Sequence, residues 1–357
     1  MSDYGKGFSI IIPSFNSGSL LIRCLKAVEL ELENQKSQYE ILVVDSSPIS
    51  PDLPSINNLK IFHSNVQLFA SETRNLGARM AKYPILVFID SDVELLSGSL
   101  SKLLGGLKDD TTVVAGVYEA LNPHTSAIST FQDLFLLYRY ENIPLAKNFF
   151  SSAQFAVSKE NFLRVGGFSE NLQSYEDVDL SFKFQKIYLK TRVCLESRGY
   201  HLKSFSLKSI FLDYYLKSRN MIYYRLNRLN DLHWCDTFIP SRIRVSYYFV
   251  FCYMFLFAMI AMPNGPVPLS LEIVVLALLL FLDILLLADF LRFIWGKTQS
   301  PIAVLKSFFF FKATTLPIIL GSLIGSYKFI SKDDSLLNKI KAVPDIVDTN
   351  ITPQSKR

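Results

Sequence analysis

The sequence contains little of what marks a disulfide-rich or zinc-binding protein. Its 357 residues include only four cysteines and four histidines. The cysteines, Cys24, Cys194, Cys235 and Cys252, are scattered without CxxC spacing. A disulfide framework and a cysteine-based zinc site are therefore not indicated.

A dense block of basic residues is also missing. Lysine and arginine number 37 against 32 aspartates and glutamates, which gives a net charge of +5. Much of this surplus lies near the apolar segments of the C-terminal part. We therefore expect membrane lipids with anionic headgroups as partners, and no nucleic acid.

The N-terminus lacks the pattern of a secretory signal. The first residues, MSDYGKG, lead directly into an apolar segment that is predicted as a strand, without a basic region, a long apolar stretch and a cleavage site. We therefore expect the first domain to lie in the cytosol.

Apolar residues are unevenly distributed along the chain. They make up 50% of it, and the length exceeds the roughly 100–200 residues of one ordinary domain. Up to about residue 240 the apolar runs are short, whereas long apolar stretches dominate from Ser246. This contrast predicts a soluble domain over 1–235, a membrane region over 236–330 and a polar tail over 331–357.

Predicted strands and helices alternate in the first domain. Strands are predicted over 8–14, 39–47, 59–64 and 84–90, and helices over 19–32 and 72–81. This βαβ rhythm is typical of an α/β fold with a mostly parallel, Rossmann-like sheet covered on both faces.

Three of these strands end in residues that could bind a ligand. They are Pro13 and Ser14, then Asp45, then Asp90 and Asp92. A single aspartate after a strand commonly forms a turn or caps a helix. Three such ends at the edge where α/β sheets bind ligands favour a functional site. The Asp-x-Asp spacing suits a hard cation such as Mg²⁺ or Mn²⁺.

Four segments of the sequence resemble the family 2 glycosyltransferases, which are inverting enzymes of the GT-A fold. The resemblance covers roughly residues 8 to 220, in the order and approximate spacing of FSIIIPSFNSGSLLIRCLKAV, YEILVVDSS, ETRNLGARMAKYPILVFIDSDVEL and FAVSKENFLRVGGFSENLQSYEDVDLSFKF. It implies a GT-A catalytic domain, followed here by a C-terminal α-helical transmembrane region.

The resemblance also implies roles in donor binding. Pro13 and Ser14 would lie against the nucleotide, and Asp45 would accept a hydrogen bond from the base, commonly uracil. Arg74 would approach the diphosphate, where its planar guanidinium suits phosphate oxygens. The alternative for Arg74 is a solvated residue on a helix face.

A divalent metal, Mn²⁺ or Mg²⁺, is the implied cofactor. Asp90 and Asp92 would hold it against the diphosphate, with Asp92 as the direct ligand. His201 stands where many family members place a histidine that reaches the metal or diphosphate, although a lone histidine is usually structural or exposed.

An acidic cluster opens a predicted helix within 173–184. The resemblance makes Asp177 the general base, gives Glu176 a role in orienting the acceptor or the base, and leaves Asp179 to support the helix start. A turn at 166–168 would bring this helix to the site. Acidic residues also favour a helix start through the helix dipole alone, which is the competing interpretation.

Two further features concern the region after the predicted base. Arg219 and Asn220 resemble a family pair on the helix that leaves the catalytic domain, and a role at the membrane interface is equally open. No Gln-x-x-Arg-Trp occurs in 200–240, which is the motif of processive synthases in this family. A non-processive enzyme is therefore favoured.

The C-terminal region contains two predicted spans, about 246–262 and 271–295, each long enough for the roughly 30 Å hydrocarbon core. Arg242 and Arg244 precede the first, Arg292 and Lys297 end the second, and the loop between has neither Lys nor Arg. Cytosolic outer flanks in a multi-pass plasma-membrane protein follow from this pattern.

Three features of this region stay open from sequence. The third segment, 301–330, is interrupted by Lys, Pro and Gly and is interfacial or spanning, with a re-entrant pair as a competitor. Asp283 and Asp289 mark either a polar pathway or a helix contact.

The function that combines these features is a membrane-anchored inverting glycosyltransferase of hexosyltransferase type in polysaccharide biosynthesis. It would move sugar from a nucleoside-diphosphate donor, with UDP as the expected carrier, to a hydroxyl of a lipid-linked or cell-surface glycan acceptor. The alternatives are a polyprenyl-phosphate glycosyltransferase, whose ionised acceptor needs no base, and a non-catalytic membrane protein that binds sugar nucleotides. A small transporter is disfavoured by the number of spans.

Overall fold

The computed structural model describes residues 7–109, 112–122, 125–142, 150–170, 172, 174–227, 240–261, 268–333 and 346–349, the last four by their backbone. The chain forms two compact units, and neither is continuous in sequence. The first comprises Met1–Thr125, Pro144–Ser204 and Ser331–Arg357, and the second comprises Ser126–Ile143 and Phe205–Ile330. The connecting residues 262–267 and most of the polar tail lie outside the described ranges.

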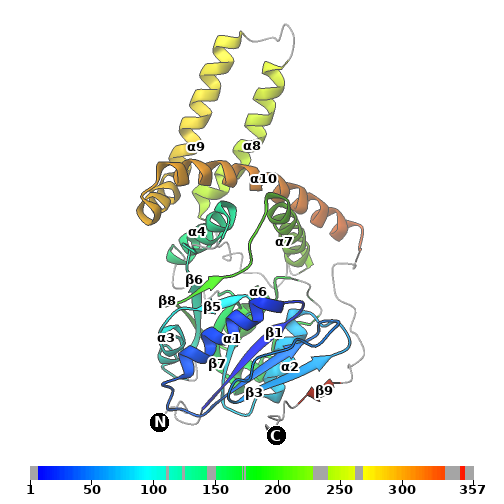
Figure 1. The fold of residues 1–357 in the computed structure, drawn as a ribbon. Coiled ribbons are helices and arrows are strands. Elements are labelled where there is room, and N and C mark those ends of the chain that lie inside the picture. The colour runs from blue at the N-terminus through cyan, green and yellow to red at the C-terminus, as the bar shows by residue number, and fades with distance from the viewer. Residues whose placement is uncertain are drawn as a thin grey trace. The chain divides into compact units, whose positions relative to one another are not determined.

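The first unit is built on one mixed sheet, whose nine described strands follow the order β5-β8-β6-β7-β4-β1-β2-β3-β9 (Figure 1). The strands β4, β1, β2 and β3 run parallel to one another. The nine strands are β1 (Phe8–Ser14), β2 (Tyr39–Asp45), β3 (Leu59–Ser64), β4 (Ile85–Ile89), β5 (Val93–Leu95), β6 (Thr112–Tyr118), β7 (Gln154–Ser158), β8 (Lys190–His201) and β9 (Ile346–Thr349).

Helices cover both faces of this sheet because its central strands are apolar on both sides. Ile10 and Ile12 pack in one core with residues of α1 (Gly18–Leu32) and α3 (Ser99–Gly105). Ile11 faces the other core, with residues of α2 (Ala70–Met80), α5 (Lys159–Arg164) and α6 (Glu176–Lys186). Each fully buried branched side chain contributes roughly 1.5–3 kcal/mol.

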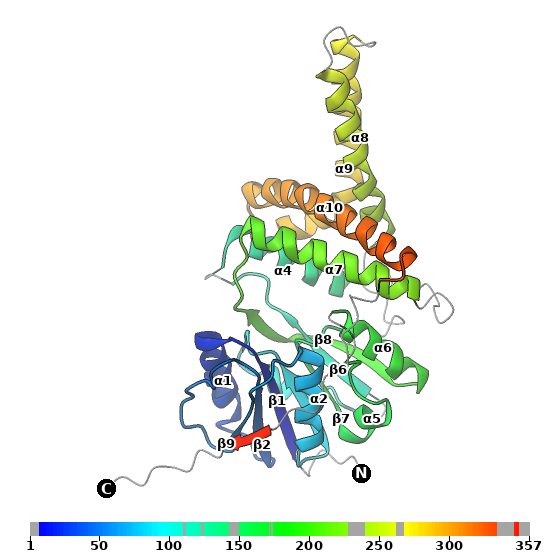
Figure 2. The same cartoon turned by 90° about the vertical axis from the view of Figure 1, so that its right-hand side faces the viewer.

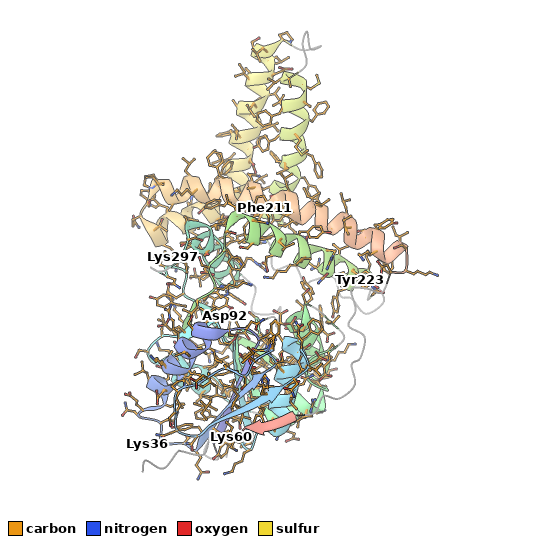
Figure 3. All side chains as sticks on the ribbon, turned by 45° about the vertical axis from the view of Figure 1, so that its right-hand side comes forward. Lys36, Lys60, Asp92, Phe211, Tyr223 and Lys297 are labelled. Atoms are coloured by element: carbon orange, nitrogen blue, oxygen red, sulfur yellow. The ribbon has the colours of Figure 1, made fainter. Side chains whose placement is uncertain are left out.

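This architecture confirms the predicted fold class, a Rossmann-like α/β domain followed by apolar helices. The predicted strands and helices of the first 90 residues are present, with ends that differ by one or two residues. Figure 3 shows Asp92 at one end of this unit and Lys36 and Lys60 at the other. The labelled positions thus mark the carboxyl and amino ends of the parallel strands.

The second unit is helical. It contains α4 (Ala127–Glu141), α7 (Leu207–Asn227), α8 (Ser241–Ile260), α9 (Leu269–Thr298) and α10 (Pro301–Ile330). The helices α8 and α9 lie side by side, and α10 crosses them at the end away from their connection (Figures 1 and 2). In the described part of the chain, α8, α9 and α10 are the three helices long and apolar enough to cross a membrane.

The segment 301–330 is one continuous helix, so the re-entrant pair left open by the sequence does not form. Gly321 and Gly325 lie against α7: a Cβ added at Gly321 would stand 2.2 Å from the Tyr215 carbonyl oxygen, and one at Gly325 would stand 2.3 Å from the Arg219 carbonyl oxygen. Small residues four apart allow two helix backbones to approach closely. These two glycines therefore allow α10 to pack closely against α7, and they do not interrupt the helix.

Aromatic rings join α4 to the C-terminal helices. Phe290 of α9 lies 5.3 Å from Phe135 and 5.2 Å from Tyr138, both of α4, between ring centroids. Phe135 also lies 5.8 Å from Phe311 of α10. These edge-to-face contacts place α4, which comes early in the chain, in the core of the second unit.

Candidate active site

The carboxyl ends of the parallel strands lie in register at one edge of the sheet. Ser14, the last residue of β1, pairs with Asp45 of β2, and Asp45 pairs with His63 of β3. Asp90 follows β4 directly. Four neighbouring strands thus bring their ends together, and three of these ends, those of β1, β2 and β4, are the ones that the sequence predicts for a ligand site.

Pro13 and Ser14 are buried at this edge. The Ser14 hydroxyl has no hydrogen-bond partner in the part of the chain that the structure describes. A buried hydroxyl without a partner costs free energy, so it is a candidate to bind a ligand.

Arg74 joins three separate segments of this site. From α2, it donates to Asp90 Oδ1 at 2.6 Å and to Glu176 Oε1 at 3.2 Å, while its guanidinium lies 5.2 Å from the Phe168 ring centroid. Burial alone would lower the pKa of Arg74, but the charges of Asp90 and Glu176 raise it. The guanidinium is therefore permanently charged, buried and held by two carboxylates.

The two aspartates after β4 have different surroundings. Burial raises the pKa of Asp90, against the opposing charge of Arg74. Burial would also raise the pKa of Asp92, but the hydrogen bond and charge of His201 and the charge of Lys203 outweigh it and lower this pKa. Asp92 is therefore the carboxylate of this pair that more readily stays ionised.

His201 lies beside Asp92. Its Nε2 is 3.5 Å from Asp92 Oδ2, and its ring stacks on Tyr118 with centroids 4.6 Å apart. The Asn122 side chain donates to the His201 carbonyl at 3.2 Å. The stacked ring and the held backbone fix the imidazole next to the carboxylate.

These side chains can be tested for their fit to a divalent metal. Among the described residues, no group of three or more histidine, cysteine, aspartate or glutamate side chains is arranged to hold an ion by itself. Arg74 already occupies one oxygen of Asp90, which leaves Asp92 and His201 as the neighbouring pair. Two protein ligands fit Mg²⁺ or Mn²⁺, which take further ligands from water and phosphates. The described residues therefore fit a metal ion that is also coordinated by a diphosphate. They do not fit a metal site formed by protein ligands alone.

The acidic cluster stands at the start of α6, after Tyr175 in a left-handed conformation (φ 76°). Glu176 is bound to Arg74. Asp177 is partly exposed and its Oδ1 accepts from the Val178 amide at 2.8 Å. Asp179 is fully buried, 2.5 Å from the Ser169 hydroxyl and 3.3 Å from Lys183 Nζ. The contacts of Asp179 are structural, whereas Asp177 retains access to solvent.

Asn75 is a positioning residue that the sequence reasoning missed. Its amide donates to the Phe168 carbonyl at 2.8 Å and accepts from the Phe168 amide at 2.8 Å. A Cβ added at Gly167, which has φ +62°, would stand 2.4 Å from Asn75 Oδ1. Asn75 thus clamps the turn that leads to the acidic cluster, and the glycine makes room for it.

Asp45 is surrounded by hydrogen-bond donors at the ends of β2 and β3. It is fully buried and accepts hydrogen bonds from the Ser47 hydroxyl at 2.7 Å, the Ser47 amide at 3.0 Å and His63 Nδ1 at 2.9 Å. His63 was not singled out from the sequence. The position of His63 at the end of a predicted parallel strand is the signal that could have found it.

Arg219 and Asn220 belong to α7 of the second unit. Arg219 Nε donates to Asn220 Oδ1 at 3.1 Å, and the guanidinium lies 5.8 Å from the Tyr215 ring centroid. The two side chains therefore interact with each other and with a neighbouring ring of the same helix.

Comparison with known families agrees with this arrangement, because residues 9–169 match the family described as Glycosyl transferase family 2. The chain contains a family 2 glycosyltransferase domain. The match includes Asp45, Arg74, Asp90 and Asp92. Glu176, Asp177 and His201 follow the matched segment.

Curated proteins similar to this chain are glycosyltransferases by name. An uncharacterized glycosyltransferase of Haemophilus influenzae is 26% identical over 49% of this chain and 60% of its own length. A Campylobacter jejuni GalNAc(5)-diNAcBac-PP-undecaprenol beta-1,3-glucosyltransferase is 30% identical over 27% of this chain and 33% of its own length. The chain thus spans between a third and three fifths of these relatives.

Solved structures give a weaker likeness. A mannosyltransferase of Pyrobaculum calidifontis, in complex with GDP-Man and Mn²⁺, has a TM-score of 0.46 and 14% identity, covering 91% of this chain and 87% of its own. That similarity is too low to carry an argument about donor or metal. The assignment of the family 2 domain rests on the sequence match.

Proposed function

We propose that this chain is a membrane-anchored inverting glycosyltransferase. It transfers a hexose-type sugar from a nucleoside-diphosphate sugar, with UDP as the carrier, to a hydroxyl of a lipid-linked or cell-surface glycan acceptor. It adds one sugar per encounter and contributes to polysaccharide biosynthesis. The cytosolic catalytic domain over 1–235 and the membrane region over 236–330 are part of this proposal.

The observation that carries the proposal is the buried position of Arg74 between Asp90 and Glu176. These residues come from α2, the end of β4 and the start of α6, and they meet at the carboxyl edge of the sheet. A buried guanidinium whose Nε has no partner among the described side chains has capacity for a further acceptor. The diphosphate of a sugar nucleotide is such an acceptor.

The chemistry assigned to these residues is a single displacement. The acceptor oxygen attacks the anomeric carbon while the bond from that carbon to the diphosphate oxygen breaks, and its electron pair leaves with the diphosphate. Asp177 takes the proton of the acceptor hydroxyl as general base. Arg74 binds the leaving diphosphate, and Glu176 orients the acceptor or the base. Inversion follows because attack and departure take place on opposite faces of the sugar.

A divalent metal held by Asp92 and His201, with Asp90 nearby, would supply positive charge for the leaving diphosphate. On the protein side, Asp92 contributes an ionised carboxylate whose pKa is lowered by His201. Arg74 neutralises Asp90, so that the two aspartates do not repel each other at full charge.

Membrane attachment is supported by α8 and α9, which expose large apolar side chains such as Phe255, Phe257, Leu278 and Phe281. A helical hairpin of this kind is suited to lipid. Arg242 and Lys297 lie at its outer ends, which supports a cytosolic position of those ends. We assign α10 to the interface. Its exposed apolar residues include Leu316, Leu320, Leu323 and Tyr327 along one face.

Nucleotide release from a panel of sugar nucleotides tests the proposal. The purified full-length protein, with lipid-linked or glycan acceptors and Mn²⁺, should liberate UDP or GDP from at least one donor. Asp92→Asn should abolish Mn²⁺-dependent binding of the nucleoside diphosphate. Glu94→Gln, two residues further on, is the matched control, because Glu94 forms a partly exposed pair with Arg23 and ion pairs near the surface contribute little.

Metal-dependent binding that survives in Asp92→Asn would contradict the metal assignment. Absence of nucleotide release with every donor and acceptor would contradict the enzymatic proposal. Orientation has its own test: a cysteine introduced at Asn264 should be labelled from outside intact cells, and one introduced at Lys36 should not.

A further inference from the structure

The C-terminal tail contributes a strand beside the strand ends of the candidate site. Ser14 of β1 is the register partner of Asp45 of β2, and Asp45 is the register partner of His63 of β3. The row continues to Val347 of β9, which pairs with His63 on the outer side of β3 (Figure 1). A segment that follows the apolar helices in the sequence is therefore part of the same edge of the sheet.

The direction of the backbone groups in β3 shows what β9 contributes. The Ile41 amide donates to the Asn58 carbonyl at 2.9 Å, from β2 to the residue that precedes β3. Since backbone groups point to alternate sides along a strand, the even-numbered residues of β3 face β2 and the odd-numbered residues face away from it. Ile61 and His63 therefore direct their N–H and C=O groups towards β9.

In the part of the chain that the structure describes, β9 is the outermost strand on this side of the sheet. Without β9, the N–H groups of Ile61 and His63 would have no ladder partner, and β3 would become an edge strand. The end of a strand that is paired on one side only opens more readily. The His63 side chain, whose Nδ1 lies 2.9 Å from Asp45 Oδ2, would move with this end of β3.

We propose that the tail strand β9 is a positioning element of the donor site. By pairing with β3 it holds His63 in place, and His63 in turn supports the buried carboxylate of Asp45. The inference rests on the proposed function and on the role in base binding that the family resemblance implies for Asp45. It gives the C-terminal tail, which follows the membrane region, a part in binding the sugar nucleotide.

Proline substitutions in β9 test the backbone pairing. Residues 347 and 63 form a pair that exchanges both N–H···O bonds, and proline has no N–H. Val347→Pro should therefore weaken the pairing with His63. Asp348→Pro is the matched control, because the N–H of residue 348 points away from β3 and proline is tolerated at such positions of an outer strand. Val347→Ala keeps the N–H and should behave as the wild type.

Hydrogen exchange at single residues and titration calorimetry measure the effects on the full-length protein. In the wild type the amides of Ile61 and His63 should be protected. Val347→Pro should remove this protection, whereas the Phe62 amide, which faces β2, should stay protected. With Mn²⁺ present, Val347→Pro should weaken binding of UDP, or of GDP if GDP binds more tightly, by about fivefold or more, the factor for one hydrogen bond. Asp348→Pro should retain both the protection and the affinity.

Unprotected amides of Ile61 and His63 in the wild type would show that β9 does not pair with β3, and would overturn the inference. Equal nucleotide affinities in Val347→Pro and Asp348→Pro would overturn it as well. Protection that depends on protein concentration would assign the strand to the tail of a second copy, which contradicts pairing within one chain.

Failure of the wild type to bind UDP or GDP would overturn the proposed function together with the role of β9 in donor binding. The exchange of the Ile61 and His63 amides would then show separately whether β9 forms. The two failures are therefore distinguishable.

Discussion

Lys312 Nζ lies 2.5 Å from Asp283 Oδ2 and joins α10 to α9 among apolar side chains. The same carboxylate accepts hydrogen bonds from Ser246 at 2.5 Å and Tyr253 at 2.9 Å, both of α8. Three helices therefore share one fully buried aspartate. Of the two interpretations that the sequence allowed for Asp283, the structure shows the helix contact. Asp289, the second aspartate of α9, forms exposed pairs with Arg242 and Arg292.

Lys312→Met should destabilise the helical unit by about 3 kcal/mol, because it leaves Asp283 buried without its cation. Contacts of this kind inside membrane proteins often contribute less, so a loss of about 1 kcal/mol is the lower end. Lys306→Met, at an exposed position of the same helix, should change the stability by less than about 0.5 kcal/mol. Denaturant unfolding in micelles measures both. Equal losses would show that the pair is not a stabilising contact.

Gly321→Ala should destabilise the protein by about 2 kcal/mol or more, because the added methyl group would stand 2.2 Å from the backbone oxygen of Tyr215. Gly296→Ala in α9 meets no atom within 4 Å and should stabilise by about 0.5–1 kcal/mol through helix propensity. Thermal unfolding of the two variants compares them directly. A neutral Gly321→Ala would mean that α7 and α10 are not held in close contact.

Gly167→Ala and Gly166→Ala form a second matched pair. Both glycines have positive φ, so each alanine costs about 1–2 kcal/mol from backbone strain. Only at Gly167 would the methyl group also collide with Asn75, at 2.4 Å, whereas Gly166 is open. Gly167→Ala should therefore lose both more stability and more turnover. Equal turnover in the two variants would show that the contact between Asn75 and this turn does not affect catalysis.

Asp177→Asn should lower the rate of sugar transfer by roughly 10²–10⁴-fold with nearly unchanged donor affinity, because the amide cannot accept a proton. Asp179→Asn should behave in the opposite way, with stability lost through Ser169 and Lys183 and the rate of folded enzyme largely kept. Single-turnover rates and nucleotide affinity are the measurements. Preserved transfer in Asp177→Asn would indicate that Asp177 only caps its helix or that the acceptor is a phosphate.

The strands and their polar ends could be predicted from the sequence because both signals are local. Ile10, Ile11 and Ile12 are apolar in succession because both sheet faces are covered, and Asp90 follows its strand directly. Since the strands are parallel, their ends had to meet at one edge. This pattern indicates Asp90, whereas Arg74 and Glu176 are indicated by the resemblance to the family 2 glycosyltransferases.

The partners of these side chains could not be predicted in the same way. Asn75 reaches the Phe168 backbone, 93 residues away, and His63 reaches Asp45 across a strand pair. Neither contact leaves a periodic or compositional trace. The glycines in 301–330 could not be interpreted from the sequence for a related reason. Glycine often interrupts a helix, but Gly321 and Gly325 lie within one helix and allow it to pack closely against α7.

The interleaving of the two units has a consequence for truncation. A chain that stopped at residue 235 would retain α4 but lose α9 and α10. Phe131, Phe135 and Tyr138 would then lack Phe290 and Phe311, which surround them in the complete protein. These rings are nearly fully buried in the intact chain. In the fragment they would form an exposed hydrophobic patch. A fragment without the apolar helices is therefore expected to be prone to aggregation, even though eight of the nine described strands of its sheet are present.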